Sequence, residues 1–137
     1  ASHTQEFNTY VEQTSSIMGE LPSRFSPTLA YHMKKRNLSS SKLAERSLIN
    51  EDVIRRYKNG TAKNNPDIRT VLAMCVGLQL PPPLCYDMAR KAKYDFSSGE
   101  IEDIAFQTII CSMTQNSIYE CNEMLTSLGF KPLSKIT

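Results

Sequence analysis

The sequence predicts an all-α protein. Strand signals are weak because no segment sustains an alternation of β-branched and polar residues, whereas apolar residues recur at spacings of three and four along most of the chain. Residues that favour helix starts precede several of these segments. With 40% hydrophobic and 22% charged residues over 137 positions, the composition is that of an ordinary globular protein with a hydrophobic core.

Two helices are predicted in the first part of the chain. One covers residues 4–20 and carries an apolar stripe. Ser26 and Pro27 predict the start of the next, with the serine as N-cap and the proline as first helical residue, and this helix is expected to end near Asn37. The stripe of the first helix consists of Phe7, Tyr10, Val11, Met18 and Leu21.

Three further helices are predicted in the middle of the chain, opened by the capping side chains of Ser39, Asn50 and Asp67. The first two are short and are separated by a turn around Leu48. The third carries apolar residues at helical spacing, and Gly77 is expected at its end.

The last part of the chain predicts three more helices. Pro83 ends a run of three prolines and can open a helix that continues to about Lys93. Two helices follow a break at residues 95–99, and the second of them begins at a capping box formed by Ser117 and Glu120. The first of these two is expected to bury Ile101, Ile104, Ala105, Thr108, Ile109 and Met113.

Charge is distributed unevenly along the chain. Residues 26–63 contain nine Lys or Arg and three Asp or Glu, whereas residues 95–123 contain six Asp or Glu and no Lys or Arg. This pattern predicts one part of the molecule that faces a polyanion and another part that faces elsewhere. Solvated charged faces are the alternative explanation.

Other protein classes find little support. The cysteines form no C-x-x-C pair and the chain has two histidines, so we expect reduced, buried thiols in a cytoplasmic protein, no metal site and no cofactor; a disulfide framework or a zinc site is the alternative. There is no Gly-rich phosphate loop and no H-E-x-x-H motif, which argues against an enzyme, and no apolar stretch reaches membrane-spanning length. The chain begins at Ala1, which is compatible with a piece of a longer protein.

Three stretches of sequence carry a family resemblance. They read LSSSKLAER at residues 38–46, INEDVIRRYKNG at residues 49–60 and PDxxTVLxxxVGL at residues 66–78. Together they resemble the lambda-repressor-like (Cro/repressor, XRE-type) helix-turn-helix family, and the similarity covers residues 28–92. Residues 111–133 resemble, more faintly, a helical tail that follows such domains in bacterial proteins.

The resemblance implies the organisation of the chain and its mode of binding. It predicts a five-helix DNA-binding domain at residues 26–96, preceded by an N-terminal helical extension (1–25) and followed by a two-helix tail (97–137). The helix after Asn50 would lie in the major groove. The implied base-reading residues are Glu51, Asp52 and Arg56, with Arg55 beside them in reach of a base or a phosphate. The implied phosphate-binding residues are Ser39, Ser40, Lys58, Asn59, Lys63 and Asn64.

The expected function is a sequence-specific DNA-binding transcriptional regulator, a repressor-type homodimer whose tail contacts the second subunit or a protein partner. Two positions depart from the family pattern. Leu48 stands where the family usually turns on glycine, and Glu51 and Asp52 place negative charge near DNA. These acids can accept from cytosine, or they can simply stabilise the start of the helix. The alternative is a protein-interaction module of the same fold that has lost DNA binding.

Overall fold

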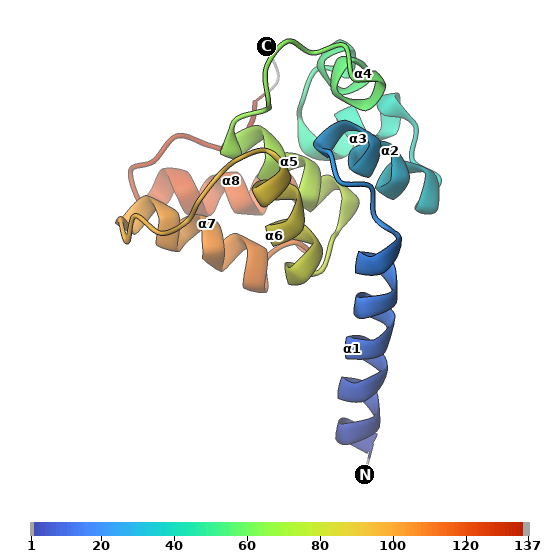
Figure 1. The fold of residues 1–137 in the computed structure, drawn as a ribbon. Coiled ribbons are helices and arrows are strands. Elements are labelled where there is room, and N and C mark those ends of the chain that lie inside the picture. Colours follow the sequence, from blue (N-terminus) through green and yellow to red (C-terminus); the bar gives the residue numbers. More distant parts are fainter. Residues whose placement is uncertain (1, 136–137) are drawn as a thin grey trace.

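A computed structural model describes residues 2–135 of the protein, and this part of the chain is all-α, as predicted, with eight helices and no strand (Figure 1). No helix in it is long and apolar enough to cross a membrane. The helices are α1 (Ser2–Glu20), α2 (Phe25–Lys35), α3 (Ser40–Ser47), α4 (Glu51–Asn59), α5 (Ile68–Leu78), α6 (Pro82–Lys91), α7 (Ile101–Ser112) and α8 (Ile118–Ser127).

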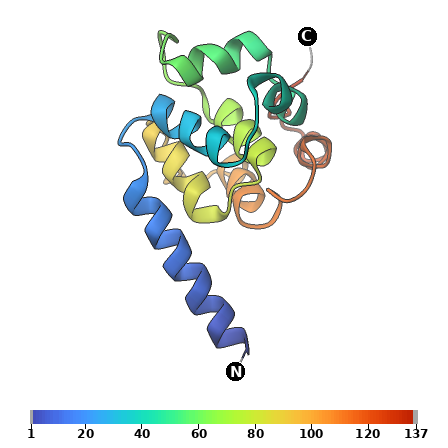
Figure 2. The same cartoon turned by 90° about the vertical axis from the view of Figure 1, so that its right-hand side faces the viewer.

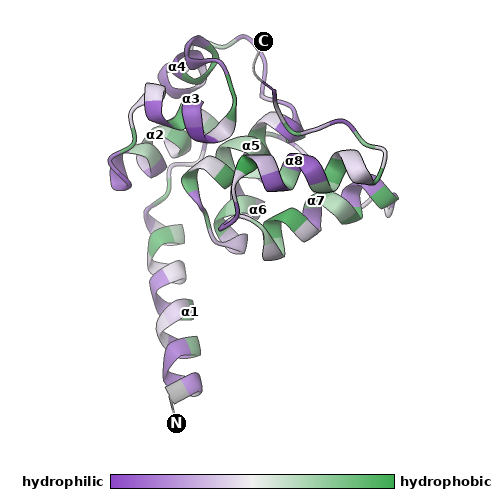
Figure 3. Ribbon diagram, turned by 180° about the vertical axis from the view of Figure 1, so that it is seen from behind, coloured by the Kyte–Doolittle hydropathy of each residue, from purple (hydrophilic) through white to green (hydrophobic). Residues whose placement is uncertain are grey.

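Helix α5 is the centre of the fold. Every residue from Val71 to Leu78 is buried, and α3, α6, α7 and α8 all contact this helix. Helix α2 packs against α4 and α6 on the outside of this group. Coloured by hydropathy, α5 is largely hydrophobic, whereas α4 at the edge of the molecule is largely hydrophilic (Figure 3). One hydrophobic core therefore runs from α2 to the residues that follow α8.

Helix α1 extends away from this body, and its free end points away from α4 in both views (Figures 1 and 2). Its last turns are anchored, since Ile17, Met18 and Leu21 pack against the core. Further toward the N-terminus the predicted apolar stripe is open to solvent, with Phe7 66% and Tyr10 43% exposed. The stripe thus attaches α1 at one end only.

The predicted capping side chains all form their hydrogen bonds. Ser39, Asn50 and Asp67 each accept a hydrogen bond from a backbone N–H in the first turn of α3, α4 and α5, at 3.1, 2.8 and 2.8 Å. Ser117 and Glu120 form the reciprocal capping box of α8. Each cap satisfies an N–H group that the helix itself leaves unpaired, which fixes where the helix begins.

The predicted start of α2 is wrong. The helix begins at Phe25, with Arg24 as the N-cap residue, so Ser26 and Pro27 lie inside the first turn and Ser26 caps nothing. Phe25 is buried and its ring meets the ring of Tyr57 edge to face, with 6.1 Å between centroids. Burial of this aromatic side chain against α4 outweighs the capping preference of the serine. Helix α6 likewise starts at Pro82, one residue before the expected proline.

Gly77 lies at the end of its helix, as predicted, but it is not the residue that terminates the helix. It is the second-last residue of α5, and Gln79 ends that helix in a left-handed conformation with φ 54°. A Cβ atom on Gly77 would lie 2.8 Å from Cδ1 of Leu43 and 3.3 Å from Cβ of Ser47, both fully buried residues of α3. The glycine is therefore needed because α3 packs directly on the backbone of α5.

We expect Gly77→Ala to lower the free energy of unfolding by about 1–3 kcal/mol, because the added methyl group overpacks the contact between α3 and α5. Gly19→Ala is the matched control, since no atom lies within 4 Å of the Cβ position in α1 and alanine is the better helix former there. Urea unfolding followed by circular dichroism measures both variants. A Gly77→Ala protein as stable as the wild type would contradict the packing described.

The buried face of α7 differs from the prediction. Ile101 and Ile104 are 70% and 56% exposed, whereas Phe106 and Ile110 are buried against α5 and α6. The physical reason is the polar residue on the buried side. Asp103 is almost fully buried and accepts hydrogen bonds from the hydroxyl groups of Tyr94 and Ser98, which makes its burial acceptable. Thr108 is exposed as well, whereas Ala105 and Ile109 are buried as predicted.

Candidate nucleic-acid interface

Helix α4 is held on one side and open on the other. Ile54 is its fully buried residue, and Val53 and Tyr57 are half-buried against the neighbouring helices. Both α2 and α3 contact α4, and it lies at the end of the molecule opposite the free end of α1 (Figure 1). The remaining side chains of α4 are therefore presented outward from a rigid support.

The turn between α3 and α4 sets the angle at which α4 is held. Leu48 adopts the left-handed conformation with φ 56°, which the sequence left as a difficulty for a residue other than glycine. Its half-buried side chain packs against the core, which offsets a backbone cost of about 1–2 kcal/mol. The segment after α8 also contacts this turn, since the hydroxyl of Ser134 donates a hydrogen bond to the carbonyl of Ser47 at 2.5 Å.

Three of the predicted base-reading residues contact one another in the first turns of α4. The Nη1 of Arg55 donates to Oδ1 of Asp52 at 2.6 Å, and its Nη2 donates to a carboxylate oxygen of Glu51. These three side chains together carry one net negative charge. The acids also lie at the positive end of the helix dipole, so both the ion pairs and the dipole favour the start of the helix at this position.

Arg56 is placed differently from Arg55. It is exposed, and within residues 2–135 it has no ion-pair partner. Its side chain borders a depression of about 330 Å³ that Val53, Thr61, Lys63 and Asn64 also line. Arg56, like Lys58 near the end of α4, is thus a cation that a ligand can reach without first breaking a salt bridge.

The start of α3 carries Ser39 and Ser40. The Ser39 hydroxyl is used as the helix cap, while Ser40 is the first residue of the helix. Lys42 follows and pairs with Glu45 at 3.5 Å. Neither serine lines the groove that the other predicted phosphate-binding residues share.

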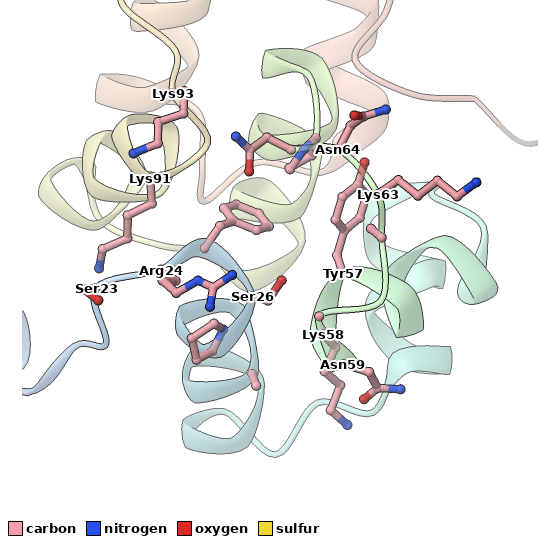
Figure 4. Close-up of a pocket in the computed structure, with 17 residues that line it drawn as sticks. Ser23, Arg24, Ser26, Tyr57, Lys58, Asn59, Lys63, Asn64, Lys91 and Lys93 are labelled. Carbon is pink, nitrogen blue, oxygen red and sulfur yellow. The ribbon is translucent and has the colours of Figure 1, made fainter.

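The other four predicted phosphate-binding residues line one groove of about 840 Å³ (Figure 4). The groove runs between the end of α4, the loop to α5 and the start of α2, and Gly60 ends α4 beside it with φ 75°. The four residues are Lys58, Asn59, Lys63 and Asn64. The structure therefore brings their side chains to a common surface next to Arg56.

The groove also contains cations that the sequence interpretation did not include. Arg24 comes from the segment before α2, and Lys91 and Lys93 come from the end of α6 (Figure 4). Lys91 and Lys93 form a basic pair in the sequence, but nothing there indicates that they meet the loop after α4. The packing of α6 against α2 brings these two lysines to the groove.

The cysteines and histidines form no metal site in the part of the chain that is described. All four cysteines are free thiols, and no three His, Cys, Asp or Glu side chains lie close enough together to hold a metal ion within that part.

Comparison with known protein families gives a match in the middle of the chain. A family model described as a Cro/C1-type helix-turn-helix DNA-binding domain matches residues 28–82. No curated protein and no solved structure matches the chain. The matched segment runs from α2 to the start of α6 and contains every residue predicted to read bases or bind phosphates.

Proposed function

Because residues 28–82 match a family model of Cro/C1-type helix-turn-helix DNA-binding domains, we propose that this protein is a sequence-specific DNA-binding transcriptional regulator that inserts α4 into the major groove. The observation that carries the proposal is the presentation of α4. One side is anchored by Ile54, and the other is solvent-exposed next to a cationic groove. The lambda-repressor-like resemblance of the sequence agrees with the family match.

In this proposal Arg56 reads a base. Its free guanidinium group has the fork geometry that matches the O6 and N7 atoms of guanine, the commonest specific contact to DNA. Glu51 and Asp52 accept hydrogen bonds from cytosine amino groups, while Arg55 balances their charge and reaches the adjacent phosphate or base. Exposed salt bridges of this kind contribute about 0.2–1 kcal/mol, so they can rearrange on binding.

Phosphate contacts position α4 in the groove. Backbone N–H groups at the start of α3, together with Ser39 and Ser40, bind one phosphate through the positive end of the helix dipole. On the other side of α4, Lys58, Asn59, Lys63 and Asn64 contact the backbone. These contacts set the register of the protein on the duplex and leave base discrimination to α4.

The test is binding to duplex DNA as a function of salt concentration. Selection from a random duplex pool should return a preferred sequence, and log K for that sequence should fall linearly with log salt because phosphate contacts release counterions. Failure to bind any duplex at low ionic strength would overturn the proposal.

We further propose that the protein binds DNA as a homodimer through its tail. A two-fold DNA site matches a two-fold dimer, which doubles the contacts of a single domain. The supporting observation is the outer face of α7, where Ile101 and Ile104 are mostly exposed although both are large apolar residues. Since residues 95–123 contain only acidic charges, this face also suits a protein partner.

We expect Ile104→Glu to convert a dimer into a monomer, because two like charges would be buried opposite each other at the seam. Sedimentation equilibrium measures the mass. Phe7→Glu is the comparison, since Phe7 is also a mostly exposed apolar residue but lies on α1. Dissociation by Phe7→Glu and not by Ile104→Glu would assign the dimer contact to α1 instead of the tail.

The second candidate function is a protein-interaction module of the same fold. The net negative charge of the Glu51, Asp52 and Arg55 cluster favours it, because DNA repels negative charge. Charge reversal of Arg55 and Arg56 separates the two candidates. It should abolish binding to DNA under the first and leave the binding of a protein partner by the tail unchanged under the second.

A further inference from the structure

The groove beside α4 is cationic along its whole length. Its five basic side chains come from four separate segments: the residue before α2, the end of α4, the loop to α5 and the end of α6. No Asp or Glu lines it, and the remaining polar lining consists of serine, asparagine and tyrosine side chains, all of which can donate hydrogen bonds. The five are Arg24, Lys58, Lys63, Lys91 and Lys93.

Two of these cations are free and lie outside the helix-turn-helix unit. Lys91 forms an ion pair, since its Nζ lies 2.7 Å from Oδ2 of the buried Asp87. By contrast, Arg24 and Lys93 are exposed and have no ion-pair partner among residues 2–135. Figure 4 shows Arg24 in the middle of the groove and Lys93 at the edge formed by the end of α6.

The local backbone explains why both side chains are available. Arg24 is the N-cap residue of α2, but its side chain makes no capping hydrogen bond. Lys93 has a left-handed backbone with φ 67°, and its N–H donates to the carbonyl of Arg90 at 2.9 Å, which closes the end of α6. Glycine is the usual residue in such a position, although Leu48 and Gln79 adopt the same conformation in this protein.

The groove is continuous with the surface that carries Arg56. The depression that Arg56 borders shares Tyr57, Ala62, Lys63 and Asn64 with the groove, and no acidic residue lines it. An uninterrupted path of positive charge therefore leads from α4, across the loop to α5, to Arg24. Charges spaced along a path fit a polymer with a phosphate at each unit better than a single small anion.

We propose that this groove holds the DNA backbone beyond the base pairs that α4 contacts, with Arg24 and Lys93 each binding a phosphate. This inference rests on the proposed function and enlarges its footprint to include the segments before α2 and after α6. The two side chains act as positioning residues, because they contact phosphates and read no base.

The test is the double variant Arg24→Gln with Lys93→Gly, bound to the preferred duplex. Loss of two phosphate contacts should reduce the slope of log K against log salt by about 1.8, at about 0.9 for each contact, and weaken binding roughly tenfold at low salt. The ranking of DNA sequences should stay unchanged. The glycine relieves the left-handed backbone, so the variant removes the charge without adding strain at that position.

Lys34→Gln with Lys35→Gln is the matched control, because it removes the same charge from exposed residues of α2 that do not line the groove. A second arm of the experiment uses a shorter duplex that ends at the base pairs read by α4. The wild type and the groove variant should bind this duplex equally, because it lacks the backbone that the groove would hold.

Each outcome separates the two proposals. If the wild type binds DNA but the groove variant keeps its affinity and salt slope, or loses no more than the lysine control, the groove proposal is overturned while the proposed function stands. If the wild type binds no duplex at low salt, the proposed function fails first.

Discussion

Arg56→Glu is expected to weaken binding to the preferred DNA sequence by about 100-fold or more. The substitution removes a bidentate contact worth about 1–3 kcal/mol of discrimination and adds a third negative charge to the surface of α4 that carries Glu51 and Asp52. Because Arg56 is exposed and makes no salt bridge among the described residues, its replacement leaves the packing of α4 unchanged. Fluorescence anisotropy with the selected duplex, at one fixed salt concentration, measures the change.

Two variants make this prediction specific to the guanidinium group. Arg56→Lys keeps the charge but not the planar fork, so it should lose discrimination between sequences more than it loses affinity. Lys131→Glu reverses a charge at an exposed residue after α8 and should have little effect. Binding by the Arg56→Glu protein at wild-type strength and with wild-type sequence preference would contradict the role given to this residue.

Arg55 illustrates a difference that sequence position alone does not reveal. Arg55 and Arg56 are neighbours, and the sequence interpretation placed both at the DNA. In the folded protein Arg55 points back along α4 to Glu51 and Asp52, one turn earlier, whereas Arg56 points to the loop after α4. The spacing of three and four residues makes the first arrangement predictable from helix geometry. We therefore expect the larger effect on sequence preference from Arg56.

Features governed by local interactions were predictable from the sequence. Ser39, Asn50 and Asp67 cap their helices as expected, because a capping side chain bonds to a backbone N–H only two or three residues away. Local signals failed where tertiary packing competed with them. Burial of Phe25 moved the start of α2, and the close approach of Leu43 to Gly77, which requires a glycine there, has no signal in the sequence.

The candidate site was also predictable where its residues are close together in the sequence, and not where they are far apart. Every residue of α4 and of the loop that follows it is within one stretch of sequence, so the resemblance could name them. The groove was not predictable, because Arg24 and Lys93 are far apart in the sequence and meet Lys63 only through the packing of α2, α6 and the loop. The outer face of α7 escaped prediction because the partners that satisfy Asp103 lie in the preceding loop.

Acidification below pH 6.5 is expected to destabilise the protein through His32. This residue lies in α2, is completely buried, and neither of its ring nitrogens has a hydrogen-bond partner. Burial, with a smaller contribution from the charge of Arg36, lowers the pKa of His32 to about 4, against 6.5 for the free side chain. Between these values the unfolded chain binds a proton that the folded protein does not.

The sign and size of the effect follow from this difference. Above pH 6.5 His32 is neutral in both the folded and the unfolded protein, and the free energy of unfolding has its full value. As the pH falls toward 4 the unfolded chain takes up a proton, and this stability is lost. Each unit of difference between the two pKa values corresponds to about 1.4 kcal/mol. The free energy of unfolding should therefore fall by about 3 kcal/mol between pH 6.5 and pH 4. Urea unfolding at several pH values between 7.5 and 4 measures it.

His32→Leu should flatten this pH dependence, because it removes the proton acceptor and fills the site with an apolar side chain that needs no hydrogen bond. His3→Gln is the control, since His3 is 97% exposed on α1 and its replacement should leave the wild-type dependence intact. An equal loss of stability in the His32→Leu protein would show that other groups cause it. Since α2 packs against both α4 and α6, uptake of this proton would loosen the support of α4 as well as one edge of the groove.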